Sequence, residues 1–362
     1  MQALTNGSGS SNETSNGSSN NDSPMRSIGM KRTHSNVSHQ DLSNIMNGKD
    51  DEGKLPTNMD DFLAHLVSGD APNSIIIDCT TSDAIAQLHP KWLVGGAHVV
   101  CSSKRGIASS YDLYQSIFAA AASSKRMYMS ETTIGASLPI NTTLHDILCS
   151  GDAIHAIVGL MSVSVGVVIT DICENNSSFT QALSHTYKTG LFEDDVFVDL
   201  EGREAAQKLL ILARQLGYPL NLEDIEVEAL AKRRIVSDWN NLGTLFAEED
   251  RVLAARAAAA KAKGCTLRYV QRIECTPPAE LGCDTTIKPK ATVRLEEVPL
   301  NSPFAMVKGA VYYFAFHTER YKQHPLIVQG PLSDSANAAS GVVGDILRIA
   351  KSMGARDRGQ KL

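Results

Sequence analysis

The sequence predicts an α/β protein with two sheets: an incomplete parallel sheet near the start, and a mixed sheet in a following α+β domain. Two β-to-loop-to-α units follow one another between residues 74 and 124, which favours parallel strands joined by right-handed crossovers. The strand-like segments after residue 266 lie too close together for crossover helices, which favours antiparallel or mixed pairing. A polar segment precedes both regions.

The first region alternates short apolar runs with helical segments. Its expected elements are a helix from Met59, a strand Ser74–Asp78, a helix to Leu93, a strand Ala97–Cys101, a helix Tyr111–Ser124 and a strand Met127–Ser130. The strand Ser74–Asp78 is continuously apolar, as is typical of a buried parallel sheet. Because ligands of such sheets bind at the carboxyl ends of the strands, the polar loops after Asp78 and Cys101 are candidate site loops.

From residue 131 the pattern changes. The expected elements are helices Thr143–Ser150, Ser178–Thr189, Glu204–Leu216 and Glu248–Lys263, and strands Ala153–Met161, Leu267–Glu274, Thr286–Glu296 and Ala310–Phe316. The strand Pro325–Gln329 and the helix Ala338–Ser352 repeat the β-to-α character of the front, which predicts a return to the first domain. The predicted domains are therefore 59–130 with 325–362, and 131–324.

Composition limits the classes of function. Residues 1–58 are rich in Ser, Asn, Gly and Asp and are predicted to be a disordered tail. A net charge of -6 argues against a nucleic-acid partner. A membrane span is not expected, because the sequence has no run of about twenty uninterrupted apolar residues. The seven cysteines form no CxxC pair and are expected to be reduced thiols. We recognise no signal peptide, so an intracellular protein, cytoplasmic or organellar, with a small-molecule or protein partner is expected.

The segment Glu193–Gly217 is the richest in candidate chemistry. It places several carboxylates before a helix and sets Lys208 four residues after Glu204, on the same helical face. One interpretation is an acidic loop, a capped helix and a surface salt bridge. The other is a site: Lys208 lies beside an apolar face, where partial desolvation would lower the pKa of its amine. The carboxylates would then hold a small cation, such as the ammonium group of an amino acid.

Five motifs occur in order along the chain: IIIDCTTSDAIA, HVVCSSKRG, ETTIGASLPI, LEGREAAQKLLILAR and HTERYKQHPLIVQGP. Together, over about residues 59–350, they resemble homoserine dehydrogenases, and most closely the dehydrogenase half of the bifunctional aspartate kinase–homoserine dehydrogenases. The resemblance implies NAD- or NADP-dependent interconversion of L-aspartate 4-semialdehyde and L-homoserine, a step toward threonine and methionine. It also implies a homodimer.

The resemblance assigns catalytic and substrate-binding roles to residues of both predicted domains. Lys208 and Lys104 match the family's two active-site lysines, where an ammonium group can exchange a proton with the substrate oxygen. Glu193 and Asp199 match the positions that hold the substrate ammonium, and Glu204 stands where the family usually has Asp. Ser164 belongs to the motif of the substrate loop.

Two further sets match cofactor and ion positions. Cofactor-binding residues implied by the resemblance are Cys79, Thr80, Thr81, Ser103, Lys104 and Gly330. A monovalent cation, Na⁺ or K⁺, would be bound by Glu131, Ile134, Ala136 and Leu138, chiefly through backbone oxygens. Each set has a simpler interpretation. The hydroxyl-rich turn Cys79–Thr81 can be a helix N-cap. The loop that contains Glu131 and Leu138 can be a tight strand-to-helix turn that needs Gly135.

The sequence also departs from the family pattern. No GxGxxG motif follows a strand, so the Rossmann-like sheet is expected to be incomplete and its pyrophosphate cradle absent. Val163 replaces a glycine of the substrate loop, and would obstruct the site if that glycine needs positive φ or close substrate approach. The family's GPGAG becomes Gly330 to Asp334, and TPNKK becomes Cys101 to Arg105, in which Lys104 is kept.

Three hypotheses follow. The first is a working homoserine dehydrogenase. The second is a catalytically silent paralogue that acts as a binding or regulatory partner of an active enzyme. The third is a truncated gene model of the bifunctional enzyme. The retained lysines and carboxylates favour the first hypothesis, and the missing glycine loop favours the other two. The sequence leaves the choice between NAD and NADP open.

Overall fold

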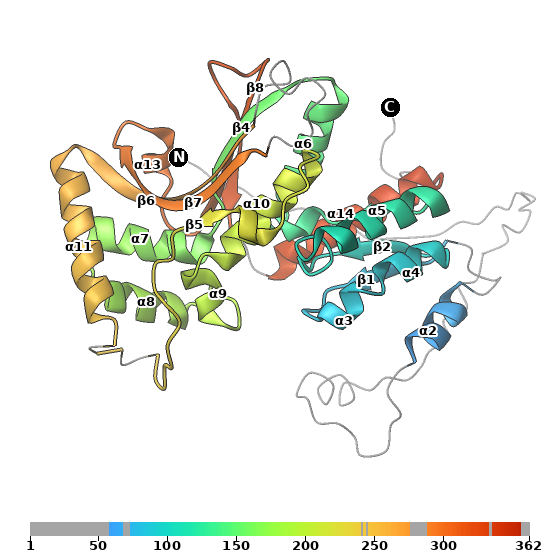
Figure 1. Ribbon diagram of the computed structural model, residues 1–362, viewed down its shortest axis with the longest axis horizontal. Coiled ribbons are helices and arrows are strands. Elements are labelled where there is room, and N and C mark those ends of the chain that lie inside the picture. The colour runs from blue at the N-terminus through green and yellow to red at the C-terminus, as the bar shows by residue number, and fades with distance from the viewer. Residues whose placement is uncertain are drawn as a thin grey trace, which may run out of the picture. The chain divides into compact units, whose positions relative to one another are not determined.

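The computed structural model describes residues 58–67, 73–239, 242–243, 245–275, 288–332 and 335–355, all within one compact unit. The tail predicted for residues 1–58 lies outside these residues except for Asn58. The described chain forms a three-stranded sheet, in the order β1-β2-β3, and a six-stranded sheet, in the order β5-β7-β6-β4-β8-β9 (Figure 1). The predicted α/β class with a parallel and a mixed sheet is therefore confirmed.

The three-stranded sheet is parallel throughout, as predicted. Its strands are β1 (Ile75–Asp78), β2 (His98–Cys101) and β3 (Tyr128–Met129). All four residues of β2 are buried, as expected for a central strand covered on both faces. The register pairs Asp78 with Cys101, so β1 and β2 end side by side. The loops that follow both strands consequently begin at the same edge of the sheet.

Helices accompany these strands. They are α2 (Met59–Leu66), α3 (Asp83–Ala86), α4 (His89–Val94) and α5 (Tyr111–Ser124). The bounds of α5 are those predicted, because the Ser110 hydroxyl caps its first turn by accepting a hydrogen bond from the Leu113 N–H at 3.3 Å. The single helix expected up to Leu93 is two short ones. Pro90 lies in the first turn of α4, where proline is tolerated, so the chain starts a new helix there.

The six-stranded sheet is mixed. Its strands are β4 (Ile154–Leu160), β5 (Glu226–Val227), β6 (Cys265–Glu274), β7 (Lys290–Pro299), β8 (Val311–Thr318) and β9 (Leu326–Pro331). All of its neighbouring pairs are antiparallel except β5 with β7. Residues 286–287 of the predicted strand Thr286–Glu296 lie outside the described chain.

The end of the chain corrects one prediction. The expected return of Pro325–Gln329 to the parallel sheet is wrong, since β9 pairs antiparallel with β8 in the mixed sheet. The connection between β8 and β9 is too short for the crossover that parallel pairing requires, but it suits a hairpin. The following helix, α14 (Ser335–Ser352), does contact β2. Only the helix rejoins the first region.

The remaining helices surround the mixed sheet. They are α6 (Ile140–Cys149), α7 (Val163–Asn175), α8 (Phe179–Lys188), α9 (Val196–Leu200), α10 (Arg203–Gln215), α11 (Ala247–Ala262) and α13 (Pro303–Met306), with short 3₁₀ turns η1 (Glu131–Thr133) and η2 (Leu222–Asp224). Helices α7, α9 and α13 were not expected from the sequence. Helix α10 contacts β6 and β7 and is buried along nearly its whole length. None of the helices in the described residues is both long and apolar enough to cross a membrane.

Candidate functional site

Helix α10 carries the centre of the site. Glu204 and Lys208 lie one turn apart on its buried face, with only 5% and 4% of their surfaces exposed. The helix begins after Gly202, which has φ +74 and fits tightly against β6. A Cβ atom there would lie 2.3 Å from the Tyr269 hydroxyl, so only glycine allows this approach. The simple interpretation of a surface salt bridge is wrong, because the pair is buried.

Lys208 is fully occupied by partners. Its Nζ lies 2.6 Å from Glu204 Oε1 and donates hydrogen bonds to Met161 O at 2.8 Å and to the Tyr312 hydroxyl at 3.3 Å. The predicted lowering of its pKa is wrong. Burial is the largest single influence and acts in that direction, but the Glu204 carboxylate and the Tyr312 hydroxyl together outweigh it and raise the pKa of Lys208 above its usual value. Lys208 is therefore an ammonium group at neutral pH.

Lys104 reaches the same carboxylate from the other sheet. It lies in the loop after β2, and its Nζ is 3.4 Å from Glu204 Oε1 and 3.1 Å from Glu193 Oε1. Burial opposes its charge, but Glu204 and Glu193 raise its pKa despite the neighbouring Lys208. Burial would likewise raise the pKa of Glu204, yet the two ammonium groups hold it below the usual value. Glu204 thus bridges two lysines and stays ionised.

Asp199 completes the charged group. It lies in α9, is 3% exposed, and accepts hydrogen bonds from the Ser164 hydroxyl at 2.5 Å and the Glu193 N–H at 3.0 Å. Burial, together with the charge of Glu204, raises the pKa of Asp199 to about 6. Ser164 comes from the first turn of α7, so four segments of the chain converge here. The structure brings all six residues assigned to chemistry and substrate into one network.

The charges of this network do not cancel. Two ammonium groups, on Lys104 and Lys208, face three carboxylates, on Glu193, Glu204 and Asp199. When all five groups are ionised their charges sum to -1. A buried or half-buried site with one unbalanced negative charge favours a cationic ligand group.

A cavity of about 290 Å³ opens beside these charges. It is lined by Lys104 and Glu193 together with the loops that follow β1 and β2. The predicted cofactor residues among its lining are Cys79, Thr80, Thr81 and Ser103. The loop hydroxyls therefore share this cavity with Lys104 and Glu193, whereas Glu204, Lys208 and Asp199 lie behind those two residues and are not part of its lining.

Two residues that position the site were missed. Arg214, six residues after Lys208, is buried and donates hydrogen bonds to Ile107 O at 2.8 Å and Ser109 O at 2.7 Å. These bonds tie α10 to the loop that carries Lys104. An arginine among the apolar residues of the helix was the available signal. Tyr312, the hydroxyl partner of Lys208, lies in β8, and no local pattern marks it.

The predicted ion loop is well ordered but lies apart from the lining of that cavity. The Glu131 carboxylate accepts hydrogen bonds from the N–H groups of Asn141 at 2.8 Å and Thr142 at 3.1 Å, and so caps α6. Ala136 has φ +54, in the left-handed region. Leu138 contacts Gly330 of β9, where a Cβ atom would lie 2.6 Å from Leu138 Cδ2. Gly330 thus packs against the ion loop, which also includes Ile134 in the core.

The structure bears on two of the departures from the family pattern. Val163 is the first residue of α7, is 4% exposed, and is not among the described residues with positive φ. The positive-φ condition for the predicted obstruction is therefore not met in the structure, and valine adopts this conformation without strain. Of the altered GPGAG motif, Ser333 and Asp334 lie outside the described residues.

Known families match both regions. The family model "Homoserine dehydrogenase, NAD binding domain" matches residues 32–131, and the model "Homoserine dehydrogenase" matches residues 139–347. The first match begins inside the segment predicted as a tail. Its description, with the parallel sheet and its polar loops, defines the class as an oxidoreductase family with an NAD-binding domain.

Relatives give the same answer. The chain is 30% identical over 306 residues to a homoserine dehydrogenase of Emericella nidulans, covering 81% of this chain and 80% of that protein. It is 34% identical over 286 residues to the chloroplastic bifunctional aspartokinase/homoserine dehydrogenase 1 of Arabidopsis thaliana, covering 78% of this chain. The chain spans only 30% of that bifunctional protein's length. The chain belongs to the homoserine dehydrogenase family, as the motifs predicted.

Solved structures share the fold. A Candida auris protein of unknown function superposes with a TM-score of 0.73 at 26% identity, covering 86% of this chain and 84% of that one. A hyperthermophilic archaeal homoserine dehydrogenase in complex with NADPH gives a TM-score of 0.60 at 20% identity, covering 86% and 82%. The second likeness supports the fold alone.

Proposed function

We propose that this chain is a homoserine dehydrogenase, interconverting L-aspartate 4-semialdehyde and L-homoserine with NADPH or NADH. The observation that carries the proposal is the network of Lys104, Glu193, Asp199, Glu204 and Lys208 beside a cavity lined by the strand-end loops. Both substrates are amino acids, and their ammonium group supplies the positive charge that the network lacks. The reaction would serve the biosynthesis of threonine and methionine.

In this proposal the carboxylates hold the ammonium group. Glu193 is 45% exposed in its side chain and lines the cavity, so it can meet a ligand without losing its bond to Lys104. Asp199 holds Glu193 in position by accepting a hydrogen bond from the Glu193 N–H. Glu204 holds the two lysines, and its longer side chain replaces the usual Asp of the family. Ser164 fixes Asp199 through its hydroxyl.

Lys208 and Lys104 are the proposed proton donors. As aldehyde becomes alcohol, the substrate oxygen gains negative charge and needs a proton. An ammonium group whose pKa is raised stays charged, stabilises the developing oxyanion and supplies that proton. In the reverse direction the same groups orient the alcohol. The raised pKa values support acid catalysis of the reduction more than base catalysis of the oxidation.

The cofactor would lie against Cys79, Thr80, Thr81 and Ser103. These residues fit the nicotinamide end, because their polar groups line the same cavity as Lys104. A bound nicotinamide supplies or accepts the hydride. Within the described chain no glycine-rich turn joins a strand to a helix at this edge, so the pyrophosphate would rest on other backbone groups. Gly330 is the remaining predicted cofactor residue; it is not among the residues that line this cavity, so its role rests on the family resemblance.

Three finer assignments stay with this proposal. A monovalent cation, Na⁺ or K⁺, would be held by oxygens of the loop containing Glu131, Ile134, Ala136 and Leu138. A homodimer is proposed from the family and from exposed apolar side chains such as Met306, which is 73% exposed. The compartment is intracellular, either cytoplasmic or organellar, consistent with the chloroplastic relatives.

The test uses the purified 362-residue chain. NADPH binding is titrated by fluorescence, and reduction of aspartate semialdehyde is assayed with wild type and Lys208→Ala. We expect micromolar NADPH binding in both proteins and a loss of about 10²- to 10⁴-fold in kcat for the variant. Lys261→Ala, on exposed helix α11, is the matched control and should keep full activity. A folded wild-type protein with neither NADPH binding nor turnover would overturn the proposal.

A further inference from the structure

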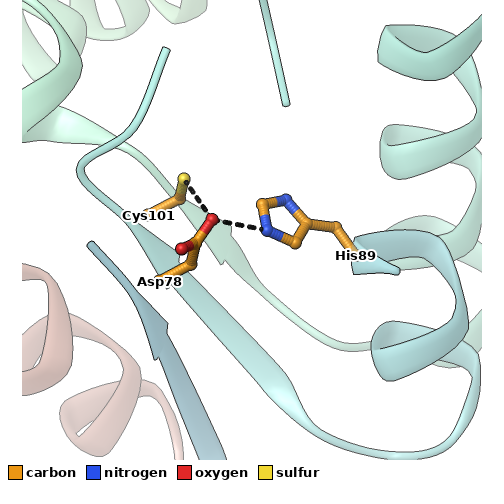
Figure 2. A group of neighbouring side chains, drawn as sticks. All are labelled: Asp78, His89 and Cys101. Atoms are coloured by element: carbon orange, nitrogen blue, oxygen red, sulfur yellow. Dashed lines mark hydrogen bonds and ion pairs between the residues drawn. The ribbon is translucent and has the colours of Figure 1, made fainter. Parts of the chain in front are cut away.

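A second cluster of reactive side chains lies beneath the cavity, outside the charged network. Asp78 ends β1, Cys101 ends β2, and His89 opens α4 (Figure 2). Their donor atoms all lie within 4.8 Å of one another. The three residues are 2%, 0% and 0% exposed, so the cluster is sealed from solvent. Carboxylate, imidazole and thiol together are donors that suit zinc.

We propose that Asp78, His89 and Cys101 form a binding site for a divalent transition-metal ion of the zinc type. The ion would be held by Asp78 Oδ2, His89 Nε2 and Cys101 Sγ. It would join the ends of two neighbouring strands directly before the loops that line the cavity. The proposal concerns these residues alone and stands or falls independently of the dehydrogenase activity.

The spacing of the donor atoms supports the site. Metal–ligand bonds of about 2.0 Å to oxygen or nitrogen and about 2.3 Å to sulfur place neighbouring donors of a tetrahedron roughly 3.3 to 3.6 Å apart. Here Asp78 Oδ2 lies 3.0 Å from His89 Nε2 and 3.8 Å from Cys101 Sγ. These two separations bracket the tetrahedral value, and the third pair of donor atoms, His89 Nε2 and Cys101 Sγ, lies within 4.8 Å.

Each donor is also oriented by a second contact, which for the Cys101 thiol is a hydrogen bond donated to Ser103 O at 3.2 Å. The Nδ1 atom of His89 lies 3.2 Å from the Tyr128 hydroxyl, which directs the Nε2 atom toward Asp78. The other oxygen of Asp78 accepts a hydrogen bond from the Thr80 N–H at 2.8 Å. Such outer partners fix the ligands of metal sites and set the tautomer of a ligating histidine. The cluster therefore has oriented donors as well as suitable donor types.

Charge balance is the third argument. A carboxylate, a thiolate and a neutral imidazole carry two negative charges, which one divalent cation cancels. A neutral complex suits a site without solvent exposure, because an unbalanced buried charge is costly. Binding replaces the thiol proton of Cys101 by a metal–sulfur bond, and the proton is released to solvent. Nothing is oxidised or reduced.

The test measures metal binding to the full chain. After treatment with a chelator, Co²⁺ is titrated as a spectroscopic probe, followed by competition with Zn²⁺. We expect one ion per chain and a near-ultraviolet thiolate-to-cobalt band. Cys101→Ser should abolish the thiolate band and weaken binding by more than about 100-fold, since even outer partners contribute about 10- to 100-fold.

Cys149 provides the matched control. It pairs with His145 on the exposed face of α6, with Sγ 3.3 Å from Nε2, and is the alternative place where a metal could bind. Cys149→Ser should leave the Co²⁺ spectrum unchanged. If Cys101→Ser fails to fold, X-ray absorption spectroscopy of the zinc-loaded wild type tests the site instead. We expect one sulfur atom in the first coordination shell of zinc. No stoichiometric binding, a spectrum lost with Cys149, or a zinc shell without sulfur would each overturn the proposal.

Discussion

The two sheets handle buried polar groups in different ways. Beside the mixed sheet, Lys208 and Glu204 are full charges that compensate one another, and their partners come from three other segments. Beneath the cavity, at the ends of β1 and β2, the buried groups are Asp78, His89 and Cys101, joined by hydrogen bonds. The region beside the mixed sheet contains paired opposite charges. The region at the ends of β1 and β2 contains a compact group of possible metal-donor atoms.

The difference shows how the work of a dehydrogenase can be divided. In the proposed function, proton transfer and ammonium binding need charges held in place before the substrate arrives, and the α10 network would supply them. Cofactor contact needs loops at strand ends, which would be those after β1 and β2. Lys104 belongs to both regions, because it leaves the β2 loop and reaches Glu204 and Glu193. The buried Arg214 fixes that loop to α10, so the two regions share one geometry.

The largest expected effect comes from removing the carboxylate that both lysines share. Glu204→Ala would leave the buried Lys208 ammonium with only Met161 O and the Tyr312 hydroxyl as partners. We expect a loss of about 3–5 kcal/mol in the free energy of unfolding, the usual cost of an unpaired buried charge. Urea unfolding followed by circular dichroism measures it.

Two controls sharpen this prediction. Glu248→Ala removes an equally close partner of Arg251 on exposed helix α11 and should have little effect. The double variant Glu204→Leu with Lys208→Met replaces the pair by apolar side chains of similar size, and should recover most of the stability while staying inactive. An unchanged unfolding midpoint in Glu204→Ala would mean that the network is not buried in solution.

The next effect is a pH dependence of substrate binding. Burial and the charge of Glu204 raise the pKa of Asp199 to about 6. Above that pH the five groups sum to -1, and below it Asp199 is protonated and the sum is zero. The KM for aspartate semialdehyde should therefore rise as pH falls through about 6. Loss of one charge-assisted interaction predicts a change of roughly tenfold or more.

Asp199→Asn is the comparison for this profile. The variant has no proton to gain near pH 6, so its KM should be raised at neutral pH and should lack the step seen in wild type. Steady-state kinetics at saturating NADPH separate the two profiles. They are measured between roughly pH 5 and 8, where most proteins are most stable. A wild-type KM that stays flat across pH 6 contradicts the role proposed for Asp199.

Sequence reasoning succeeded where local signals were strong. The Ser110 cap fixes the start of α5, and the apolar run Ile75–Ile77 predicts a parallel strand. The burial predicted for that strand is only partly correct, because β1 is an end strand of the described sheet and Ile77 is 47% exposed. It missed α7, because a helix rich in β-branched residues such as Val163 and Ile169 lacks a helical pattern and depends on packing against β6 and α8. Tertiary contacts decided that segment.

In the site, too, local features could be predicted from the sequence and tertiary contacts could not. The spacing of Glu204 and Lys208 predicted their pairing, but the direction of the Lys208 pKa depended on how close the carboxylate would lie. Burial alone favours a lowered pKa, and a partner at 2.6 Å reverses it. The partner Tyr312 lies 104 positions away in the chain, and the sequence contains no local sign of that contact.

The smallest expected effect tests how α14 ties the parallel-sheet region to the ion loop. A Cβ atom on Gly341 would lie 2.4 Å from Thr132 Cγ2 and 3.3 Å from Ala136 O, whereas one on Gly344 would meet nothing within 4 Å. Alanine favours a helix over glycine by about 1 kcal/mol, so Gly344→Ala should stabilise the chain by up to that amount. Gly341→Ala should instead destabilise it, because overpacking costs about 1–3 kcal/mol. Urea unfolding of both variants measures the difference. Equal effects would show that α14 does not press on the loop, and that the loop's left-handed Ala136 is held by the mixed-sheet region alone.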